Sequence, residues 1–238
     1  MNLKIDNTWS LFLDRDGVLN ERLADDYVKT WEQFHFLAGV PEALKLLSGV
    51  FGHIFIVTNQ QGIGKGLMSE NDLHHIHNRL VTEVRNAGGK IDKIYHSPYL
   101  ASVNHISRKP AIGMGLKAKS DFSEIRFNKS IMVGDSLSDL IFGKRLKMKT
   151  VLLGDSTLAR KSPYFTDYFY PDLLTFALTF ADLDSLKDCP RALRGPAPNA
   201  GQRRRLQEGL GQRTAPDGPR IRGGHGEDRQ GTGSPVSR

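Results

Sequence analysis

The sequence has a single cysteine, Cys189, so no disulfide can form within the chain. Such low cysteine usage is typical of proteins that work in a reducing compartment. The sequence also lacks an apolar stretch of about 18 residues, the usual minimum for a membrane-spanning helix. Residues 1–20 lack the basic start and apolar run that mark a secretory signal. We therefore expect a cytoplasmic protein that does not enter a membrane.

Residues 190–238 lack lysine and every aromatic residue type. They contain ten arginines against four acidic residues, a net charge of +6, together with ten glycines and six prolines. The first 189 residues carry a net charge of only +1 and hold all twelve phenylalanines, all six tyrosines and both tryptophans. Because a segment so poor in apolar residues cannot offset the entropy of ordering, we predict a folded domain over residues 1–187 and a disordered basic tail over 188–238.

The arginine run of this tail, residues 203–205, would attract the phosphates of any nucleic acid. No aromatic residue lies between the arginines to stack on bases, as single-strand binding proteins require. We therefore expect no specific nucleic-acid binding.

Apolar segments alternate with amphipathic ones through the first 155 residues. The apolar segments predict strands at Ser10–Leu13, His53–Thr58, Ile91–His96, Ser130–Gly134 and Thr150–Leu153. The amphipathic segments predict helices at Val40–Leu47, Ser69–Ala87, Gly113–Ser123 and Ser138–Leu146, the second of them beginning with a capping box between Ser69 and Asp72. Strands that are apolar throughout are typical of a sheet covered on both faces. The pattern predicts an α/β fold, a Rossmann-like three-layer sandwich with a central, mainly parallel sheet.

Polar motifs follow four of the predicted strands. Asp14 and Asp16 come after the first strand, residues 58–62 (TNQQG) after the second and Asp135 after the fourth, while residues 108–110 (RKP) lie in the loop after the third. Taken alone, an Asp-x-Asp-Gly segment is equally well explained as a polar turn. Ligands of parallel sheets bind beyond the carboxyl ends of the strands, and four polar motifs at such ends indicate an active site.

These residue types suit phosphoryl transfer through an aspartyl-phosphate. Asp14, closest to the strand, is the candidate nucleophile, and Asp16 is the candidate general acid and base. Mg²⁺ would offset the repulsion between carboxylate and phosphate, with Asp14, Asp16 (through its main-chain carbonyl) and Asp135 as ligands. Thr58 can hydrogen-bond the phosphate, and Lys109 can place its ammonium group against it.

Four segments resemble the motifs of the haloacid dehalogenase superfamily of phosphatases: DRDGVLN (14–20), VTNQQGIGKG (57–66), RKP (108–110) and VGDSLSD (133–139). The first two are more similar to the capless group that acts on sugar phosphates and histidinol phosphate. The resemblance covers residues 10 to about 155 and implies a capless, magnesium-dependent phosphatase. It also implies that Thr58, Asn59, Gln60 and Lys109 contact the transferred phosphate and that Arg108 points towards the other end of the substrate.

For the substrate, the resemblance implies a small phosphorylated metabolite. A sugar bisphosphate of the heptose type is the first expectation, and histidinol phosphate or another small metabolite is the alternative. A non-catalytic module that senses a phosphate ligand is the alternative from a different class, and the presence of both Asp14 and Asp16 argues against it. The segment after Asn20 is expected to form a small flap that holds Asp26, Tyr27 and Val28 over the substrate.

Heptose-type members of this group carry a structural zinc loop with three cysteines and one histidine before the RKP motif. The corresponding segment here offers only His96 and His105, and two ligands do not make a tetrahedral zinc site. We therefore expect no structural zinc.

Two further features have competing explanations. Asp139 either joins the metal site or orients Lys109, and the sequence leaves both open. The histidines at positions 74, 75 and 77 diverge around their helix, so they cannot converge on one ion, and we expect them on the surface.

Overall fold

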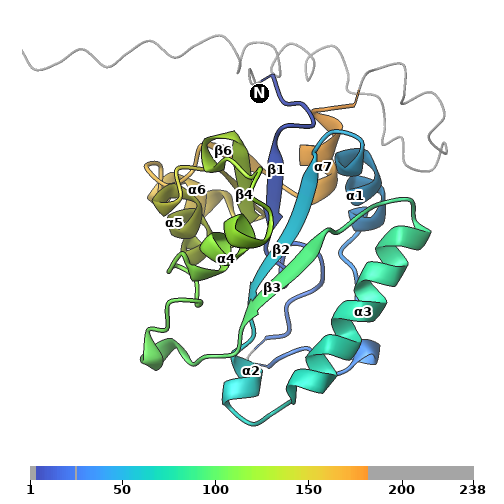
Figure 1. Ribbon diagram of the computed structural model, residues 1–238, viewed down its shortest axis with the longest axis vertical. Coiled ribbons are helices and arrows are strands. Elements are labelled where there is room, and N and C mark those ends of the chain that lie inside the picture. The colour runs from blue at the N-terminus through green and yellow to red at the C-terminus, as the bar shows by residue number, and fades with distance from the viewer. Residues whose placement is uncertain (1–3, 25, 182–238) are drawn as a thin grey trace, which may run out of the picture. The chain divides into compact units, whose positions relative to one another are not determined.

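A computed structural model describes residues 4–24 and 26–181 of the chain (Figure 1). The basic tail predicted over residues 188–238, with Cys189, lies outside the described residues, as does the end of the predicted folded domain, so both predictions stay untested.

Six strands of the described chain form one sheet in the order β3-β2-β1-β4-β5-β6, and each neighbouring pair is parallel. The strands are β1 (Ser10–Leu13), β2 (His53–Asn59), β3 (Lys93–Ser97), β4 (Ser130–Gly134), β5 (Lys149–Leu153) and β6 (Tyr168–Tyr170). The chain builds β1, β2 and β3 outwards in one direction and then returns to place β4 on the other side of β1. The α/β prediction with a parallel sheet is confirmed.

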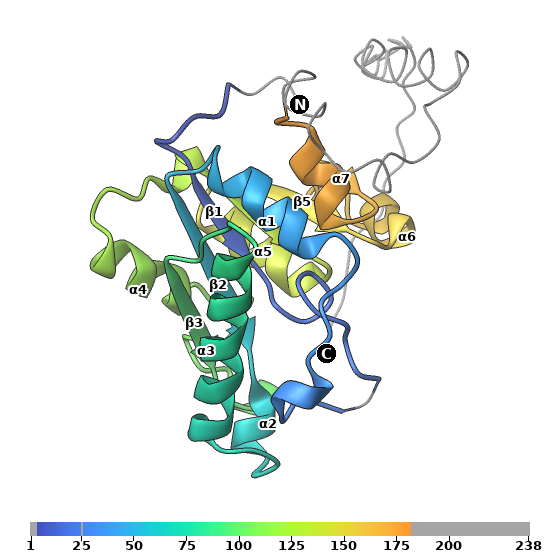
Figure 2. The ribbon, with the colours of Figure 1, turned by 90° about the vertical axis from the view of Figure 1, so that its right-hand side faces the viewer.

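Helices lie on both faces of the sheet, with α1, α3 and α7 on one side and α4 and α5 on the other (Figure 1). Figure 2 shows α1 and α3 over the same face, where they contact each other. The helices of the described part are α1 (Val40–Ser48), α2 (Gln61–Gly64), α3 (Glu70–Asn86), α4 (Gly113–Asp121), α5 (Leu137–Arg145), α6 (Ser156–Lys161) and α7 (Leu173–Leu178).

The strands divide the core into two apolar clusters because successive side chains point to opposite faces of a sheet. In β1, Leu11 and Leu13 belong to the cluster under α1, α3 and α7, whereas Phe12 belongs to the cluster under α4 and α5. In β4, Met132 likewise lies opposite its neighbours. All of these side chains are fully buried, which explains why β1 and β4 carry apolar residues on both faces.

The predicted elements agree closely with the structure up to β5. The strands β1 and β4 have the predicted bounds, and the capping box between Ser69 and Asp72 is present at the start of α3. The sequence analysis missed α2, α6, β6 and α7. Each of these elements is at most six residues long, too short to show a helical or strand period.

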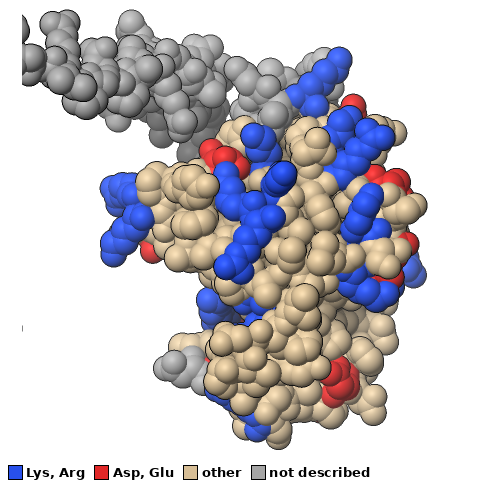
Figure 3. Space-filling view, turned by 60° about the vertical axis from the view of Figure 1, so that its left-hand side comes forward, with Lys and Arg blue, Asp and Glu red and all other residues tan. Residues whose placement is uncertain are grey.

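No helix among the described residues has both the length and the apolar character needed to cross a bilayer. On the face that Figure 3 presents, lysine and arginine side chains are more prominent than aspartate and glutamate. This excess of positive charge favours the approach of anionic molecules.

Candidate active site

The candidate site lies where the strand order reverses, between β1 and β4. Asp14 directly follows β1 and Asp135 directly follows β4. The main-chain N–H of Asp14 donates to the carbonyl of Val133 over 3.0 Å, so the pairing of the two strands continues into the site. Such reversal points leave a crevice beyond the carboxyl ends of the strands, which is where α/β sheets bind ligands.

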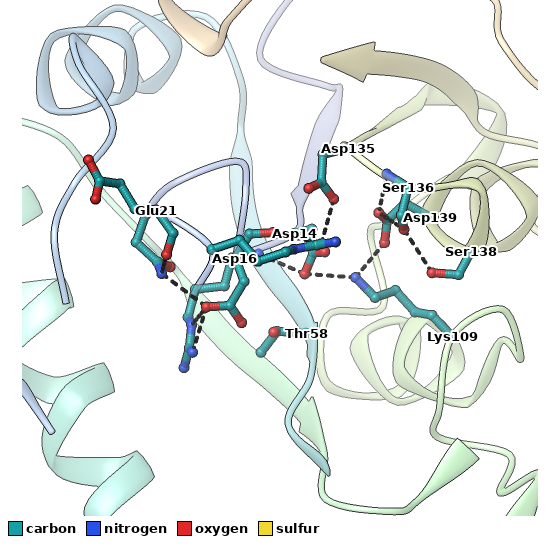
Figure 4. Close-up of polar contacts among 12 residues, drawn as sticks. Asp14, Asp16, Glu21, Thr58, Lys109, Asp135, Ser136, Ser138 and Asp139 are labelled. Atoms are coloured by element: carbon teal, nitrogen blue, oxygen red, sulfur yellow. Dashed lines mark hydrogen bonds and ion pairs between the residues drawn. The ribbon is translucent and has the colours of Figure 1, made fainter. Parts of the chain in front are cut away.

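Three carboxylates meet in this crevice. One oxygen from each of Asp14, Asp135 and Asp139 lies within 4.8 Å of the other two, and Figure 4 shows the side chains facing one another. Burial, with the charge of Asp139 added, raises the pKa of Asp14 to about 7. Burial, again with Asp139, raises the pKa of Asp135 to about 6 although Arg22 opposes it. The cluster therefore favours the binding of a cation.

The glycine of the Asp-x-Asp-Gly segment makes room for Asp135. Gly17 has a φ of +86°, which side chains other than glycine rarely adopt. A Cβ atom at this position would lie 2.0 Å from Oδ2 of Asp135. The turn after β1 can therefore approach the end of β4 only with glycine at position 17.

Lys109 lies buried between two of the carboxylates. Its Nζ is 2.8 Å from Oδ1 of Asp14 and 2.6 Å from Oδ1 of Asp139. Burial alone would lower the pKa of Lys109, but Asp139 and Asp14 outweigh burial and raise it. The side chain of Asn59 fixes the Lys109 main chain, because its Nδ2 donates to the carbonyl over 3.1 Å and its Oδ1 accepts from the N–H over 3.0 Å. Lys109 is thus held as a cation at a defined position.

The geometry at Asp139 favours one of the two roles considered for it, metal binding or the orientation of Lys109. Its Oδ1 faces Lys109, and its Oδ2 accepts hydrogen bonds from the main-chain N–H of Ser136 over 3.1 Å and from the Ser136 hydroxyl over 2.6 Å (Figure 4). Both oxygens are therefore occupied at the start of α5. This arrangement favours a role in orienting Lys109 over direct metal binding.

Asp16 is held as a carboxylate by its neighbours. Its Oδ1 accepts from Nε and Nη2 of Arg15 over 3.2 and 2.8 Å and from Nδ2 of Asn20 over 2.9 Å. Its Oδ2 accepts one bond, from Nε2 of Gln60 over 2.8 Å. Burial favours the protonated form, but Arg15, Asn20 and Gln60 together hold the pKa of Asp16 below its usual value. A general acid role therefore requires Asp16 to gain a proton as substrate binds, and Oδ2 is the oxygen with room for it.

The structure places Gln60 behind the crevice. Its Nε2 donates to Oγ1 of Thr58 over 2.9 Å as well as to Asp16, and the residue is only 1% exposed. Thr58 is equally buried, and Figure 4 shows its side chain beside that of Asp16. The phosphate contacts expected for Gln60 and Thr58 stay predictions, and for Gln60 the observed bonds indicate support of Asp16 instead.

A cavity of about 320 Å³ opens over the carboxylates. The expected flap residues Asp26, Tyr27 and Val28 lie on its wall, and Nε2 of Gln61 donates to the Tyr27 hydroxyl over 2.8 Å. Its lining residues are Asp14, Asp16, Arg22, Leu23, Asp26, Tyr27, Val28, Asn59, Gln61, Arg108, Lys109, Ser136 and Ser138.

The sequence analysis missed Arg22 as a residue of this site. One nitrogen of its guanidinium, Nη2, donates to the main-chain carbonyl of Asp16 over 3.1 Å and to Oδ1 of Asp135 over 2.8 Å. The one sequence signal for Arg22 was its position shortly after the first motif. No residue pattern connects positions 22 and 135.

The surface location expected for the histidines of α3 is wrong for His77. His74 and His75 are exposed, but His77 is 6% exposed because it lies one helical turn from the buried Leu73. Its Nε2 lies 3.3 Å from Nη1 of Arg15. A guanidinium only donates, so this nitrogen of His77 must accept and the ring must be neutral.

We expect His77 to make the stability of the protein depend on pH. Burial and the nearby Arg15 hold the pKa of His77 well below 6.5, so the folded state binds the proton less readily than the unfolded state. The contribution of His77 to the free energy of unfolding should then be maintained above pH 6.5 and fall below it by up to about 1.4 kcal/mol per pH unit. Asp14 and Asp135, whose pKa values are raised, act in the opposite sense, so the effect of His77 is read from a comparison of variants. Between pH 7.5 and 5.5, urea unfolding should show less loss of stability for His77→Gln than for the wild type.

The exposed His75 provides the matched control for this measurement. His75→Gln should keep the full loss of stability at low pH, because its ring lies in solvent in the folded state. An equal pH dependence in wild type and His77→Gln would show that the buried ring does not carry the effect.

The histidines of the predicted zinc segment have other partners. His96 lies in β3, with Nε2 2.8 Å from a carboxylate oxygen of Glu70. The His105 ring stacks on Tyr99 with 3.6 Å between ring centroids. The expected absence of zinc stays a prediction.

Comparison with known proteins identifies the family. The model of the family described as polynucleotide kinase 3 phosphatase matches residues 10–163. A D-glycero-alpha-D-manno-heptose-1,7-bisphosphate 7-phosphatase of Mycobacterium tuberculosis is 44% identical over 132 residues, which cover 56% of this chain and 70% of the relative. An enzyme of the same name from Campylobacter jejuni is 39% identical over 146 residues, covering 61% and 82%.

A solved structure has the same fold. The D,D-heptose 1,7-bisphosphate phosphatase from B. bronchiseptica, complexed with magnesium and phosphate, has a TM-score of 0.64 and 26% identity, covering 72% of this chain and 97% of that one. Residues 10–163, which the family model matches, contain the acidic crevice described above. The chain therefore belongs to the polynucleotide kinase 3 phosphatase family and is a phosphatase with the haloacid dehalogenase fold.

Proposed function

We propose that the protein is a magnesium-dependent phosphomonoesterase that hydrolyses the 7-phosphate of a D-glycero-D-manno-heptose 1,7-bisphosphate. The observation that carries this proposal is the meeting of Asp14, Asp16 and Asp135 with Lys109 at one edge of the sheet. The heptose substrate is supported by the names of the relatives from M. tuberculosis and C. jejuni. A cytoplasmic location remains the expectation drawn from the low cysteine content.

The residues of the crevice fit Mg²⁺. The ion prefers hard oxygen ligands, and Asp14, Asp135 and the main-chain carbonyl of Asp16 offer them. The guanidinium of Arg22 already hydrogen-bonds to the last two groups, so their oxygens are arranged around a position for positive charge. When bound, Mg²⁺ would neutralise charge on the phosphate and orient it towards the nucleophile.

In the proposed reaction, a carboxylate oxygen of Asp14 attacks phosphorus and the bond to the leaving alkoxide breaks, which gives an aspartyl-phosphate. Oδ2 of Asp16 donates its proton to that alkoxide. The same oxygen then takes a proton from a water molecule, whose hydroxide attacks phosphorus and releases Asp14. Lys109 and Thr58 would stabilise negative charge on the phosphoryl oxygens.

The charges of the cavity favour a substrate with a second anionic group. Besides Lys109, two guanidinium groups line the cavity, those of Arg22 and Arg108. Arg108 is held by the carbonyl of Tyr99, to which its Nη1 donates over 3.1 Å. A sugar bisphosphate supplies an anion away from the transferred phosphate, whereas histidinol phosphate supplies a cation there. The bisphosphate is therefore the better electrostatic match.

A phosphorylated nucleic-acid end is the second candidate substrate. The description of the matched family and the lysine- and arginine-rich face in Figure 3 favour it. The flap formed by residues such as Tyr27 restricts the cavity, which favours a small metabolite instead.

Phosphate release from four substrates tests the proposal. These are heptose 1,7-bisphosphate, histidinol phosphate, fructose 1,6-bisphosphate and an oligonucleotide with a 3′-phosphate, each with Mg²⁺ and with a chelator. We expect the highest kcat/KM for the heptose bisphosphate and loss of turnover in the chelator. Preference for the oligonucleotide would replace the proposed substrate, and phosphate binding without turnover of any compound would indicate a non-catalytic module.

A further inference from the structure

Arg22 lines the cavity and contacts two proposed metal ligands, but it takes no part in the proposed chemical steps. Its Nη2 bridges the main-chain carbonyl of Asp16 and the carboxylate of Asp135, two of the three groups assigned to the metal. The Arg22 side chain is nevertheless 52% exposed, whereas that of Asp135 is 19% exposed. A half-exposed cation thus contacts two proposed metal ligands.

The guanidinium and a divalent cation cannot occupy this position together. Both would use the same oxygens of Asp16 and Asp135, and Mg²⁺ requires its ligands at about 2.1 Å in near-octahedral geometry. Two positive charges at such a distance also repel each other. Arg22 must leave these oxygens when the metal binds.

The surroundings of Arg22 allow this movement. Residues 21–24 and 26–30 form no helix or strand. The main chain is anchored before Arg22, where the N–H of Glu21 donates to the carbonyl of His35 over 2.9 Å, so the half-exposed Arg22 side chain is the part that can move. The Arg22 side chain is half exposed, and solvent screens ion pairs of this kind, so its contact with Asp135 can exchange. Arg22 lines the same cavity as Arg108.

We propose that Arg22 is a displaceable cation, which occupies the metal position in the metal-free enzyme and, once metal binds, places its charge beside Arg108 for the second phosphate of the substrate. This inference rests on the proposed function, because it takes the metal ligands and the bisphosphate from it. It makes metal loading a condition for completing the binding site of the distal phosphate.

Metal titration without substrate tests the displacement. Isothermal titration calorimetry with Mg²⁺, and electron paramagnetic resonance with Mn²⁺, measure affinity independently of turnover. Arg22→Met removes the competing cation, so we expect metal to bind about three- to fivefold more tightly, the range that loss of a weak exposed pair allows. Arg108→Met removes the same charge from the same cavity without a contact to the ligands, and we expect a smaller change from it.

A second experiment measures the kinetics of Arg22→Met with substrate at saturating Mg²⁺. For Arg22→Met, KM for the heptose bisphosphate should rise about tenfold, while KM for the corresponding 7-monophosphate should change little, because the monophosphate has no distal phosphate to lose. An equal change for both compounds would overturn the specificity role.

The metal titrations distinguish a failure of the Arg22 proposal from a failure of the proposed function. Unchanged metal affinity in Arg22→Met, or an equal gain in Arg108→Met, would overturn the displacement while Asp135→Asn still loses metal binding. If Asp135→Asn also bound metal like the wild type, the proposed metal site itself would be wrong, and the inference would fall with it.

Discussion

Replacement of Asp14 by asparagine should lower kcat for phosphate release by at least about 10³-fold, the scale expected when a nucleophile is removed. The amide carries no negative charge, and its oxygen is too weak a nucleophile to attack phosphorus. The loss should appear in kcat at saturating substrate and Mg²⁺, measured as phosphate release. Stopped-flow measurement should also show no burst of alcohol product, because no aspartyl-phosphate can form.

The folded structure should survive this change. Burial raises the pKa of Asp14 to about 7, so its ionised form is unfavourable in the folded state at neutral pH. The neutral amide removes this cost, while Lys109 keeps its ion pair with Asp139. The unfolding temperature of metal-free Asp14→Asn should therefore equal or exceed that of the wild type. Turnover within tenfold of the wild type, in protein that is verified by mass to contain asparagine, would rule out Asp14 as the nucleophile.

Replacement of Lys109 by methionine should give the largest loss of stability. The ammonium group is buried between Asp14 and Asp139, so its removal leaves two buried carboxylates without their shared cation. Breaking a buried ion pair in this way costs about 3–5 kcal/mol. Chemical denaturation of the metal-free protein at pH 7.5 should show this loss, and phosphate release should fall with it.

A second substitution separates the charge effect from loss of packing. In Lys109→Met with Asp139→Asn, the most buried carboxylate is neutral, so we expect recovery of at least half of the lost stability. Activity should not return, because the phosphate still lacks its ammonium partner. A double variant no more stable than Lys109→Met would mean that methionine fails for reasons of shape, and that the ion pairs contribute little.

The parts of the fold that the sequence predicted are those with repeated apolar positions. Strands such as His53–Asn59 are buried on both faces, and their unbroken apolar runs leave one interpretation. In α3, the period of the apolar residues and the capping pair at Ser69 agreed with each other. The short elements after Leu153 depend on contacts with the finished sheet, which local sequence does not show.

At the site, the sequence predicted which residues lie close together, but not which groups they hydrogen-bond to. The rule that ligands bind at strand ends was enough to bring Asp14 and Asp135 together, because parallel strands share one edge. It did not show that Asn59 and Gln60 point to Lys109 and Asp16, since those bonds depend on side-chain directions in three dimensions.

The burial of His77 is another feature that the sequence analysis did not predict. Histidine is intermediate between buried and exposed residue types, and a set of three histidines on one helix predicted a polar surface. The position one turn after Leu73 was the signal against that prediction, and the buried guanidinium of Arg15 supplied the partner that a buried ring requires.

The two carboxylate oxygens of Asp139 contact different parts of the protein, one in the candidate site and one in a helix. One holds Lys109, the lysine proposed to contact the phosphate, and the other anchors the first turn of α5 through Ser136. A cell in which this position mutates would lose enzyme through degradation and through poor turnover at once. Screens that score only protein abundance should therefore still detect this aspartate, although they are blind to residues whose sole task is catalysis.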